Sequence, residues 1–319
     1  MANTTFHAAL QQARRSLPFL EVRALLCHVL EVSPAQLAAH PEQEMARMQE
    51  FDALVERRIR GEPIAYLVGS REFFGRTFKI TPAVLIPRPE TELLVEIALE
   101  KIPEKGRVLD LGTGCGNIAI ALAAHRPLAK ITAVDISEAA LQIARENLRA
   151  LFIPFPTLPL GPHPRPLSTK WRGVARDSPY PVFGGRDGGE GGRGWGGVRF
   201  IRSDWFSRVE NEKFDVIVAN PPYVAEHDPH LYQGDLRFEP RSALISGKDG
   251  LAAIRRIAAE APVHLAYGGW LLIEHGFDQS QACAELLHEQ GFQELVTAKD
   301  LAGIPRVAGG RLTRRAGNS

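Results

Sequence analysis

The chain has 319 residues, of which 45% are apolar, and its 38 Lys and Arg nearly balance its 37 Asp and Glu. This length and composition predict one or two globular domains with a sizeable core, and they argue against a broad basic surface for duplex nucleic acid. Cys27, Cys115 and Cys283 stand too far apart to indicate a disulfide framework or a zinc site, so no metal is expected. The sequence starts without a signal-peptide pattern, and no apolar run reaches about 18 residues. We therefore expect a cytoplasmic, monomeric protein without a membrane span.

Residues 1–70 are predicted to form a small helical bundle that packs against or presents a partner. Ser33 followed by Pro34 is typical of a helix start, because serine caps free backbone N–H groups and proline fits the first helical position. A further helix is expected from Glu42, with apolar residues at three-and-four spacing, and it should end at Gly61. No polar group in this segment indicates chemistry.

Residues 71–90 are predicted to be a β-hairpin linker, since residues 72–86 alternate between apolar and polar side chains. One interpretation of the end of this linker is a capped helix start, with Pro89 at the first helical position and Glu90 and Glu92 near the positive end of the helix. From residue 107 onward short apolar runs alternate with helical patterns, which predicts an α/β fold whose parallel sheet is covered on both faces. The predicted strands are RVLDL (107–111), KITAV (130–134), VRFIRS (198–203), FDVIVA (214–219) and GWLLIEH (269–275), and the predicted helices are Asn117–His125, Ser137–Leu151, Gly250–Ala261 and Ser280–Gln290.

One segment, at about residues 153–197, interrupts this alternation. It is rich in Pro, Gly and Arg and has no periodicity, so it cannot bury enough apolar surface to offset chain entropy. We interpret it as an inserted, disordered loop on the edge of the sheet away from ligands, with a closure cost on the order of 2 kcal/mol. An arm that contacts RNA through its Arg, Gly and Trp residues is the alternative.

The sequence VLDLGTGCGNIAIALA (108–123) predicts a strand, a tight turn and a helix. The turn consists of Gly112, Thr113, Gly114, Cys115 and Gly116, in which glycine allows sharp bending and lets a ligand approach the backbone. The GxGxG spacing differs from the dinucleotide fingerprint, and no Lys-Ser/Thr pair follows as in a phosphate-binding P-loop. The turn therefore favours S-adenosylmethionine, which carries an amino-acid tail and a sulfonium in place of a pyrophosphate.

Two residues at other strand ends complete the predicted cofactor site. Asp135 ends the second strand, where a carboxylate can accept both ribose hydroxyls of an adenosine. Trp205 follows the third strand, where its ring can stack on the adenine. Packing of this ring on the core is the alternative.

The sequence NPPY (220–223) ends the fourth strand. A residue before proline is held extended, and the two prolines stiffen the chain. The side-chain oxygen of Asn220 and the carbonyl oxygen of Pro221 can then point outward together, while Tyr223 supplies a flat wall. We predict a clamp for a planar NH2 group, in which two acceptors turn the lone pair of an amide nitrogen toward a methyl donor and stabilise its growing positive charge.

The chain resembles the peptide chain release factor N(5)-glutamine methyltransferases (the PrmC/HemK type). The resemblance covers nearly the whole chain except the insert, and it rests on LIPRPETELL (85–94), the glycine turn, AVDIS (133–137), NPPY and IEHG (273–276). It implies an N-terminal helical bundle (1–70) for substrate recognition, a hairpin linker (71–90) and a class I, Rossmann-like methyltransferase domain (91–319). The family's seven-stranded sheet ends in an antiparallel strand, for which RVAGGRL (306–312) is the candidate. The implied activity is methylation, from S-adenosyl-L-methionine, of the glutamine in the GGQ motif of class I release factors.

The resemblance also implies roles for individual residues. The implied cofactor contacts are Gly112, Thr113, Gly114, Cys115, Gly116, Asp135, Trp205 and Asn220. The implied catalytic residues are Asn220, Pro221 and Tyr223, and the substrate glutamine would also lie against Pro222. Pro87, Arg88 and Glu90 fall in the linker that closes over the pocket in the family, with a capped helix start as the alternative for them. The chain departs from the family in its insert and in its short basic end, LTRRAGNS (312–319).

Two other functions remain open from the sequence. An N(6)-adenine methyltransferase of DNA or RNA would present the same planar NH2 to the same clamp, but it would have to flip a base out of its stack and hold phosphates. The balanced charge argues against this, and no direct nucleic-acid partner is expected. A module that binds the cofactor and only docks a translation factor is the second alternative, and the NPPY sequence argues against it.

Overall fold

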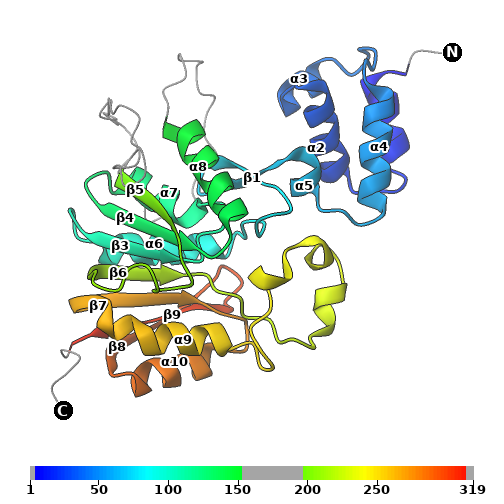
Figure 1. Ribbon diagram of the computed structural model, residues 1–319. Helices are drawn as coiled ribbons and strands as arrows, with labels where there is room; N and C mark the ends of the chain where they lie inside the picture. The colour runs from blue at the N-terminus through cyan, green and yellow to red at the C-terminus, as the bar shows by residue number, and fades with distance from the viewer. Residues whose placement is uncertain (1–3, 153–196, 314–319) are drawn as a thin grey trace. The chain divides into compact units, whose positions relative to one another are not determined.

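The computed structural model describes residues 4–152 and 197–313, which form two compact units (Figure 1). The first unit contains the described residues up to Ser70 together with Ile80–Pro82 and Pro229–Glu239. The second contains Arg71–Lys79, Ala83–Asp228 and the described residues from Pro240 onward. The predicted insert, apart from Gly197, lies outside the described residues.

The first unit is helical and has an apolar centre. Val22, Leu25 and Leu26 are fully buried there. Ser33 forms the predicted cap: its hydroxyl accepts the backbone N–H of Gln36, and the Gln36 side chain accepts the N–H of Ser33. The helices of this unit are α1 (Phe6–Ala13), α2 (Phe19–Leu30), α3 (Pro34–Ala39), α4 (Met48–Ile59) and α5 (Ile64–Val68), with the short 3-10 helices η3 (Pro229–Tyr232) and η4 (Leu236–Phe238).

The helix predicted from Glu42 begins later, at Met48. Residues before it pair with the start of the chain instead: the N–H of Met45 donates to the carbonyl of Thr4, and Thr5 forms an antiparallel bridge with Glu44. These bonds use backbone groups that a helix would need. The three-and-four spacing, which runs from Met48 to Ile59, is therefore confirmed, and the predicted start of the helix at Glu42 is wrong.

The predicted hairpin is present as β1 (Ser70–Phe73) and β2 (Arg76–Lys79). Phe74 and Gly75 between them have φ angles of 50° and 70°, the left-handed pair that a two-residue hairpin turn requires. The alternative interpretation that places Pro89 at the first helical position is wrong. α6 (Thr91–Lys101) has Glu90 at its N-cap, because the chain enters the helix through a tighter turn in which the N–H of Glu92 bonds to the carbonyl of Pro89.

A seven-stranded sheet lies at the centre of the second unit, in the order β5-β4-β3-β6-β7-β9-β8. Its strands are β3 (Arg107–Leu111), β4 (Lys130–Asp135), β5 (Val198–Arg202), β6 (Phe214–Ala219), β7 (Leu265–Glu274), β8 (Phe292–Lys299) and β9 (Pro305–Leu312). The strands β3 to β7 are parallel, and β9 is antiparallel to both β7 and β8. The predicted strands, including the antiparallel RVAGGRL, are confirmed. The sequence reading missed β8, an edge strand whose residues are mostly exposed and therefore carry a weak apolar signal.

Helices cover both faces of the sheet, as predicted. α6 contacts α7 (Asn117–His125) on one face, and α9 (Ala252–Glu260) contacts α10 (Ser280–Glu289) on the other (Figure 1). α8 (Glu138–Phe152) packs on β4 and β5, and the 3-10 helices η5 (Arg241–Ala243) and η6 (Ala261–Val263) complete the unit. None of the helices in the described ranges combines the length and hydropathy of a membrane span.

Asn147 of α8 ties the hairpin to the glycine turn. Its side chain is 2% exposed, and its Oδ1 accepts the N–H of Lys79 at 2.7 Å. Its Nδ2 donates to the carbonyls of Lys79 and Cys115 at 3.1 and 2.9 Å. One side chain thus satisfies backbone groups from two segments far apart in the sequence.

We predict that Asn147→Ala lowers the free energy of unfolding by about 1–3 kcal/mol, because the backbone groups of Lys79 and Cys115 lose their partner. Gln142→Ala is the matched control, since Gln142 is exposed on the same helix and its side chain donates to the carboxylate of Glu146, one turn further along the helix. Urea denaturation of both variants measures the difference. Equal, small effects would contradict the bridging role of Asn147.

Candidate functional site

Parallel strands end at the same edge of a sheet, and the register here aligns four chain segments at that edge. The neighbours in the last paired positions are Leu111 with Val134, Leu111 with Ala219, and Ala219 with Ile273. The residues that follow them, Gly112, Asp135, Asn220 and Glu274, therefore lie next to one another. The strand order also reverses here, since the chain passes from β3 to β5 on one side and then to β6 and β7 on the other. Open α/β sheets bind ligands at such a point.

The chain turns sharply after β3. Gly112, Gly114 and Gly116 have φ angles of 70°, 57° and 84°, in a region that glycine adopts far more readily than other residues. A side chain at Gly114 would meet no atom within 4 Å, so the bend faces open space. A side chain at Gly116 would come within 3.0 Å of the Cβ of Ala144, because α7 and α8 approach closely there.

Asp110 is a buried carboxyl group at the end of β3, just before the bend. Its Oδ2 accepts the hydroxyl of Thr113 at 2.6 Å, and its Oδ1 is buried without a hydrogen-bond partner among the described residues. Burial raises the pKa of Asp110 to about 7, and the hydrogen bond from Thr113 opposes this shift without cancelling it. Desolvation is therefore the stronger effect.

Asp135 and Trp205 border the bend. Asp135 accepts the N–H of Gly114 at 2.9 Å and the N–H of Ser137 at 2.8 Å, while burial raises the pKa of its carboxyl group. The ring of Trp205 lies 3.5 Å from the position that a side chain at Gly112 would take, and it also packs against the core. The ring is thus positioned both as a wall of the bend and as a core contact.

Asn220 follows β6 with its carboxamide oriented by α6. Its Nδ2 donates to the Oγ1 of Thr91 at 3.0 Å, and its Oδ1 is buried with no hydrogen-bond partner in the described part of the chain. Pro221 is buried, and none of the backbone N–H groups in the described turns, loops and caps donates to its carbonyl oxygen. Of the two oxygens assigned to the clamp from the sequence, the Oδ1 of Asn220 is therefore not used elsewhere in the described fold.

Tyr223 connects this segment to a carboxylate that the sequence reading did not single out. Its hydroxyl donates to the Oε1 of Glu274 at 3.3 Å, and burial of this hydroxyl, followed by the charge of Glu274, raises the pKa of Tyr223. Thr91 was also missed. A carboxylate that ends an otherwise apolar strand and a hydroxyl one residue after a Pro-Glu pair are weak local signals. The register of β6 with β7 brings Glu274 beside Asn220, and the start of α6 brings Thr91 there.

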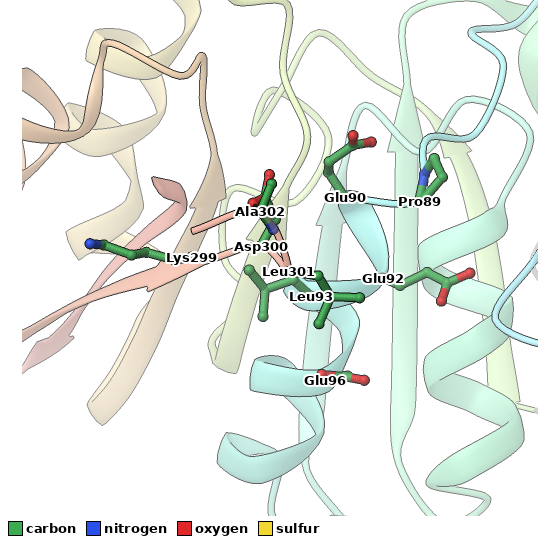
Figure 2. A pocket seen from close by; sticks show the side chains of 9 residues that line it. All are labelled: Pro89, Glu90, Glu92, Leu93, Glu96, Lys299, Asp300, Leu301 and Ala302. Carbon is green, nitrogen blue, oxygen red and sulfur yellow. Dashed lines mark hydrogen bonds between the residues drawn. The ribbon is translucent and has the colours of Figure 1, made fainter. Parts of the chain in front are cut away.

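A cavity of about 250 Å³ lies beside this edge, between the start of α6 and the loop after β8 (Figure 2). Four carboxylates line it, and burial, followed by the charges of Glu92 and Glu100, raises the pKa of Glu96. Its lining residues are Pro89, Glu90, Glu92, Leu93, Glu96, Lys299, Asp300, Leu301 and Ala302. None of them belongs to the glycine bend or to NPPY, so we place the chemistry at the strand ends and not in this cavity.

The structure brings most of the predicted site residues to one edge: Gly112–Gly116, Asp135, Trp205 and Asn220–Tyr223. Their roles remain predictions. Pro87 is buried, and Arg88 and Glu90 lie just before α6. The charge of Arg88 acts to lower the pKa of Tyr223, and the charge of Glu90 acts to raise the pKa of Glu274. Within residues 4–152 and 197–313, no group of three or more His, Cys, Asp or Glu side chains is arranged to hold a metal ion.

Comparison with known proteins gives matches over both units. Residues 4–69 match the family described as "PrmC N-terminal domain", and residues 89–155 match "Methyltransferase small domain". The chain is 45% identical over 301 residues to a release factor glutamine methyltransferase from Burkholderia pseudomallei, covering 93% of each protein. It is 40% identical over 306 residues to one from Vibrio cholerae, covering 95% of this chain and 92% of the relative. The solved catalytic domain of hMettl16, in complex with the MAT2A 3'UTR hairpin 6, has a TM-score of 0.51 at 14% identity over 82% of each chain, a likeness of fold alone.

The raised pKa of Asp110 predicts a dependence of stability on pH. Its carboxyl group titrates near 3.8 in the unfolded chain and near 7 in the folded protein, so folding takes up a proton between these values. Its contribution to stability is therefore lost as pH rises through this window, by on the order of 2–4 kcal/mol. We expect Asp110→Asn to lack this loss. Urea denaturation of the wild type and of Asp110→Asn at pH 5 and pH 8 measures this loss. If their free energies of unfolding differ by the same amount at both pH values, the prediction is contradicted.

Proposed function

This chain belongs to the family of release factor glutamine methyltransferases, and we propose that it methylates the side-chain amide nitrogen of the GGQ glutamine in class I peptide chain release factors, using S-adenosyl-L-methionine. The observation that carries the proposal is the free oxygen of Asn220. It is a buried acceptor at the ligand-binding edge of the sheet, and nothing in the described fold donates to it. An N–H bond of a substrate amide would complete its hydrogen bonding.

The residues of the glycine bend fit the proposed cofactor. The space over Gly114 is open, the ring of Trp205 borders it, and the unpartnered Oδ1 of Asp110 lies at the same strand end. Asp135 keeps lone pairs for ribose hydroxyls beyond the two backbone bonds it accepts. When bound, S-adenosylmethionine supplies a methyl carbon whose bond to a positively charged sulfur breaks as a nucleophile attacks.

The remaining task is to make an amide nitrogen nucleophilic. Its lone pair is delocalised, and breaking this resonance fully by rotation costs about 18–20 kcal/mol. We assign to the Oδ1 of Asn220 and the carbonyl of Pro221 the two N–H bonds of the glutamine amide, and to Tyr223 the wall that holds its plane. Two fixed acceptors would favour a pyramidal nitrogen and stabilise the positive charge it gains. The nitrogen would lose its proton to water after the transfer, when that proton has become acidic.

The first unit supplies the other part of the proposal. Residues 4–69 match the family described as "PrmC N-terminal domain", and we assign recognition of the release factor to the N-terminal segment, residues 1–70, that the sequence predicts to be a helical bundle. Because release factors act in translation, we propose that the enzyme works in the cytoplasm. A monomer remains our expectation, since no residue in the proposed site requires a second chain.

Methyl transfer from labelled cofactor to a purified release factor tests the function directly. We expect label in the factor with its GGQ motif intact and none in a factor whose motif glutamine is replaced. Label in both factors would contradict the assignment. Label in added DNA or RNA instead would favour the adenine alternative, and binding of cofactor and factor without transfer would favour the docking module.

We predict that Asn220→Ala lowers kcat by about 10²–10³-fold, the usual effect of losing one hydrogen-bonding group that stabilises a transition state. Cofactor affinity should change little, because the bend and Asp135 are untouched. Asn211→Ala is the control, since Asn211 is exposed and lies outside the site. Steady-state rates and cofactor titration by calorimetry separate the two effects, and a full rate in Asn220→Ala would refute the clamp.

A further inference from the structure

A chain of polar contacts links Asn220 to a carboxylate on the next strand. Asn220 donates from Nδ2 to the hydroxyl of Thr91 at 3.0 Å, and the Oε1 of Glu274 accepts the hydroxyl of Tyr223 at 3.3 Å. The side chain of Thr91 lies near enough to Glu274 to lower the pKa of its carboxyl group. The strand register explains this proximity. Ala219 pairs with Ile273 across β6 and β7, so the next residue on each strand, Asn220 and Glu274, lies beside the other.

Glu274 is not placed there to stabilise the fold. Its side chain and that of Thr91 are each 1% exposed, and the Oε2 of Glu274 has no hydrogen-bond partner among the described residues. Arg306 lowers the pKa of Glu274 through its charge, but its guanidinium forms an ion pair with Asp300 at 3.0 Å. A buried carboxylate without a cation costs stability, and an apolar residue of similar size would be favoured on energetic grounds alone.

The carboxylate does fix the direction of the hydrogen bonds. An ionised carboxylate only accepts, and a threonine hydroxyl has one proton to donate. When that proton points to Glu274, the oxygen of Thr91 can only accept, so the NH2 end of Asn220 must face Thr91. The two ends of a carboxamide are nearly the same in shape, and the network around it decides its orientation. The Oδ1 of Asn220 is thereby left facing away from Thr91, buried and unpartnered.

We propose that Glu274 and Thr91 are positioning residues that hold the carboxamide of Asn220 with its oxygen toward the substrate amide. This inference rests on the proposed function, because a substrate NH2 group needs an acceptor at this position. With the carboxamide reversed, two NH2 groups would face each other and the clamp would repel its substrate.

The orientation depends on the charge of Glu274. A protonated Glu274 can donate to Thr91, whose own proton can then turn to the oxygen of Asn220 and stabilise the reversed carboxamide. Burial raises the pKa of Glu274 to about 7 against the hydrogen bonds from Thr91 and Tyr223; Glu90 raises it further and Arg306 lowers it. Tyr223 stays neutral, and Arg88 acts on Tyr223 from the start of α6. The rate should therefore rise with pH through about 7 as the carboxyl group of Glu274 loses its proton.

Four variants test the inference at saturating cofactor and release factor. Thr91→Val removes the hydroxyl at constant shape, and Glu274→Gln replaces the acceptor with a group that also donates. We expect each to lower kcat by about 10- to 100-fold, less than the loss of the acceptor itself, with cofactor affinity nearly unchanged. Thr91→Ser restores the hydroxyl and should recover most of the rate. Thr132→Val is the matched control, because Thr132 is a buried threonine of β4 that bonds to Arg199.

Stability and pH provide readouts that a purely structural role would not produce. Above pH 7, Glu274→Gln should be more resistant to urea than the wild type, because it buries no charge. Its kcat should nevertheless be lower than that of the wild type. Its kcat should also lack the rise with pH near 7. The inference would be overturned if Thr91→Val kept the wild-type kcat, or if Thr91→Ser lost as much kcat as Thr91→Val. It would also be overturned if the kcat of the wild type did not rise with pH near 7. The pH dependence of the wild-type kcat tests the inference even if Thr91→Val fails to fold. A wild type that methylates no release factor would refute the proposed function instead.

Discussion

The in-register ends of parallel strands are the constraint on which the rest of the second unit depends. Each strand contributes a chemically distinct group to the same edge: a glycine bend after β3, a carboxylate at the end of β4, a carboxamide after β6 and a second carboxylate at the end of β7. A shift of one residue in the pairing of β6 with β7 would turn each side chain to the other face of the sheet. Buried apolar strands hold the register, so the core fixes the geometry of the polar edge.

Unsatisfied polar atoms gather at this edge. The buried side-chain atoms without a partner in the described residues include one oxygen each of Asp110, Asn220 and Glu274, and Nε2 of His275. In most folds such atoms are rare, because each costs free energy that a hydrogen bond would recover. Their concentration beside a glycine bend with open space over it is consistent with a site completed by its ligands. The same desolvation raises the pKa values of Asp110 and Glu274 to about 7.

The sequence predicted the parts of the fold that local patterns determine. Apolar runs marked the buried strands, the Ser33-Pro34 pair marked the start of α3, and glycines marked the bend after β3. It failed where backbone pairing between distant segments wins over a local pattern, as before Met48, and where a strand at the sheet edge is mostly exposed, as in β8. The strand ends of the site could be placed from the sequence because they follow strands. The positions of Thr91 and Glu274 beside Asn220 could not, because they depend on how α6 packs against β6 and on which strand lies beside β6.

The position of β9 affects how the protein reaches its native state during synthesis. It is the last strand in the described part of the chain, yet it lies between β7 and β8 and pairs with both. Until the ribosome has released residues 305–312, β7 and β8 each keep an edge of free N–H and C=O groups, which is the usual template for wrong pairing. Gly309 and Gly310 let the strand enter this slot, since a Cβ at either would come within 2.5 Å of Leu272 or 2.7 Å of Phe292. A nascent chain that stops short of this strand therefore exposes β7, the same strand that carries Glu274.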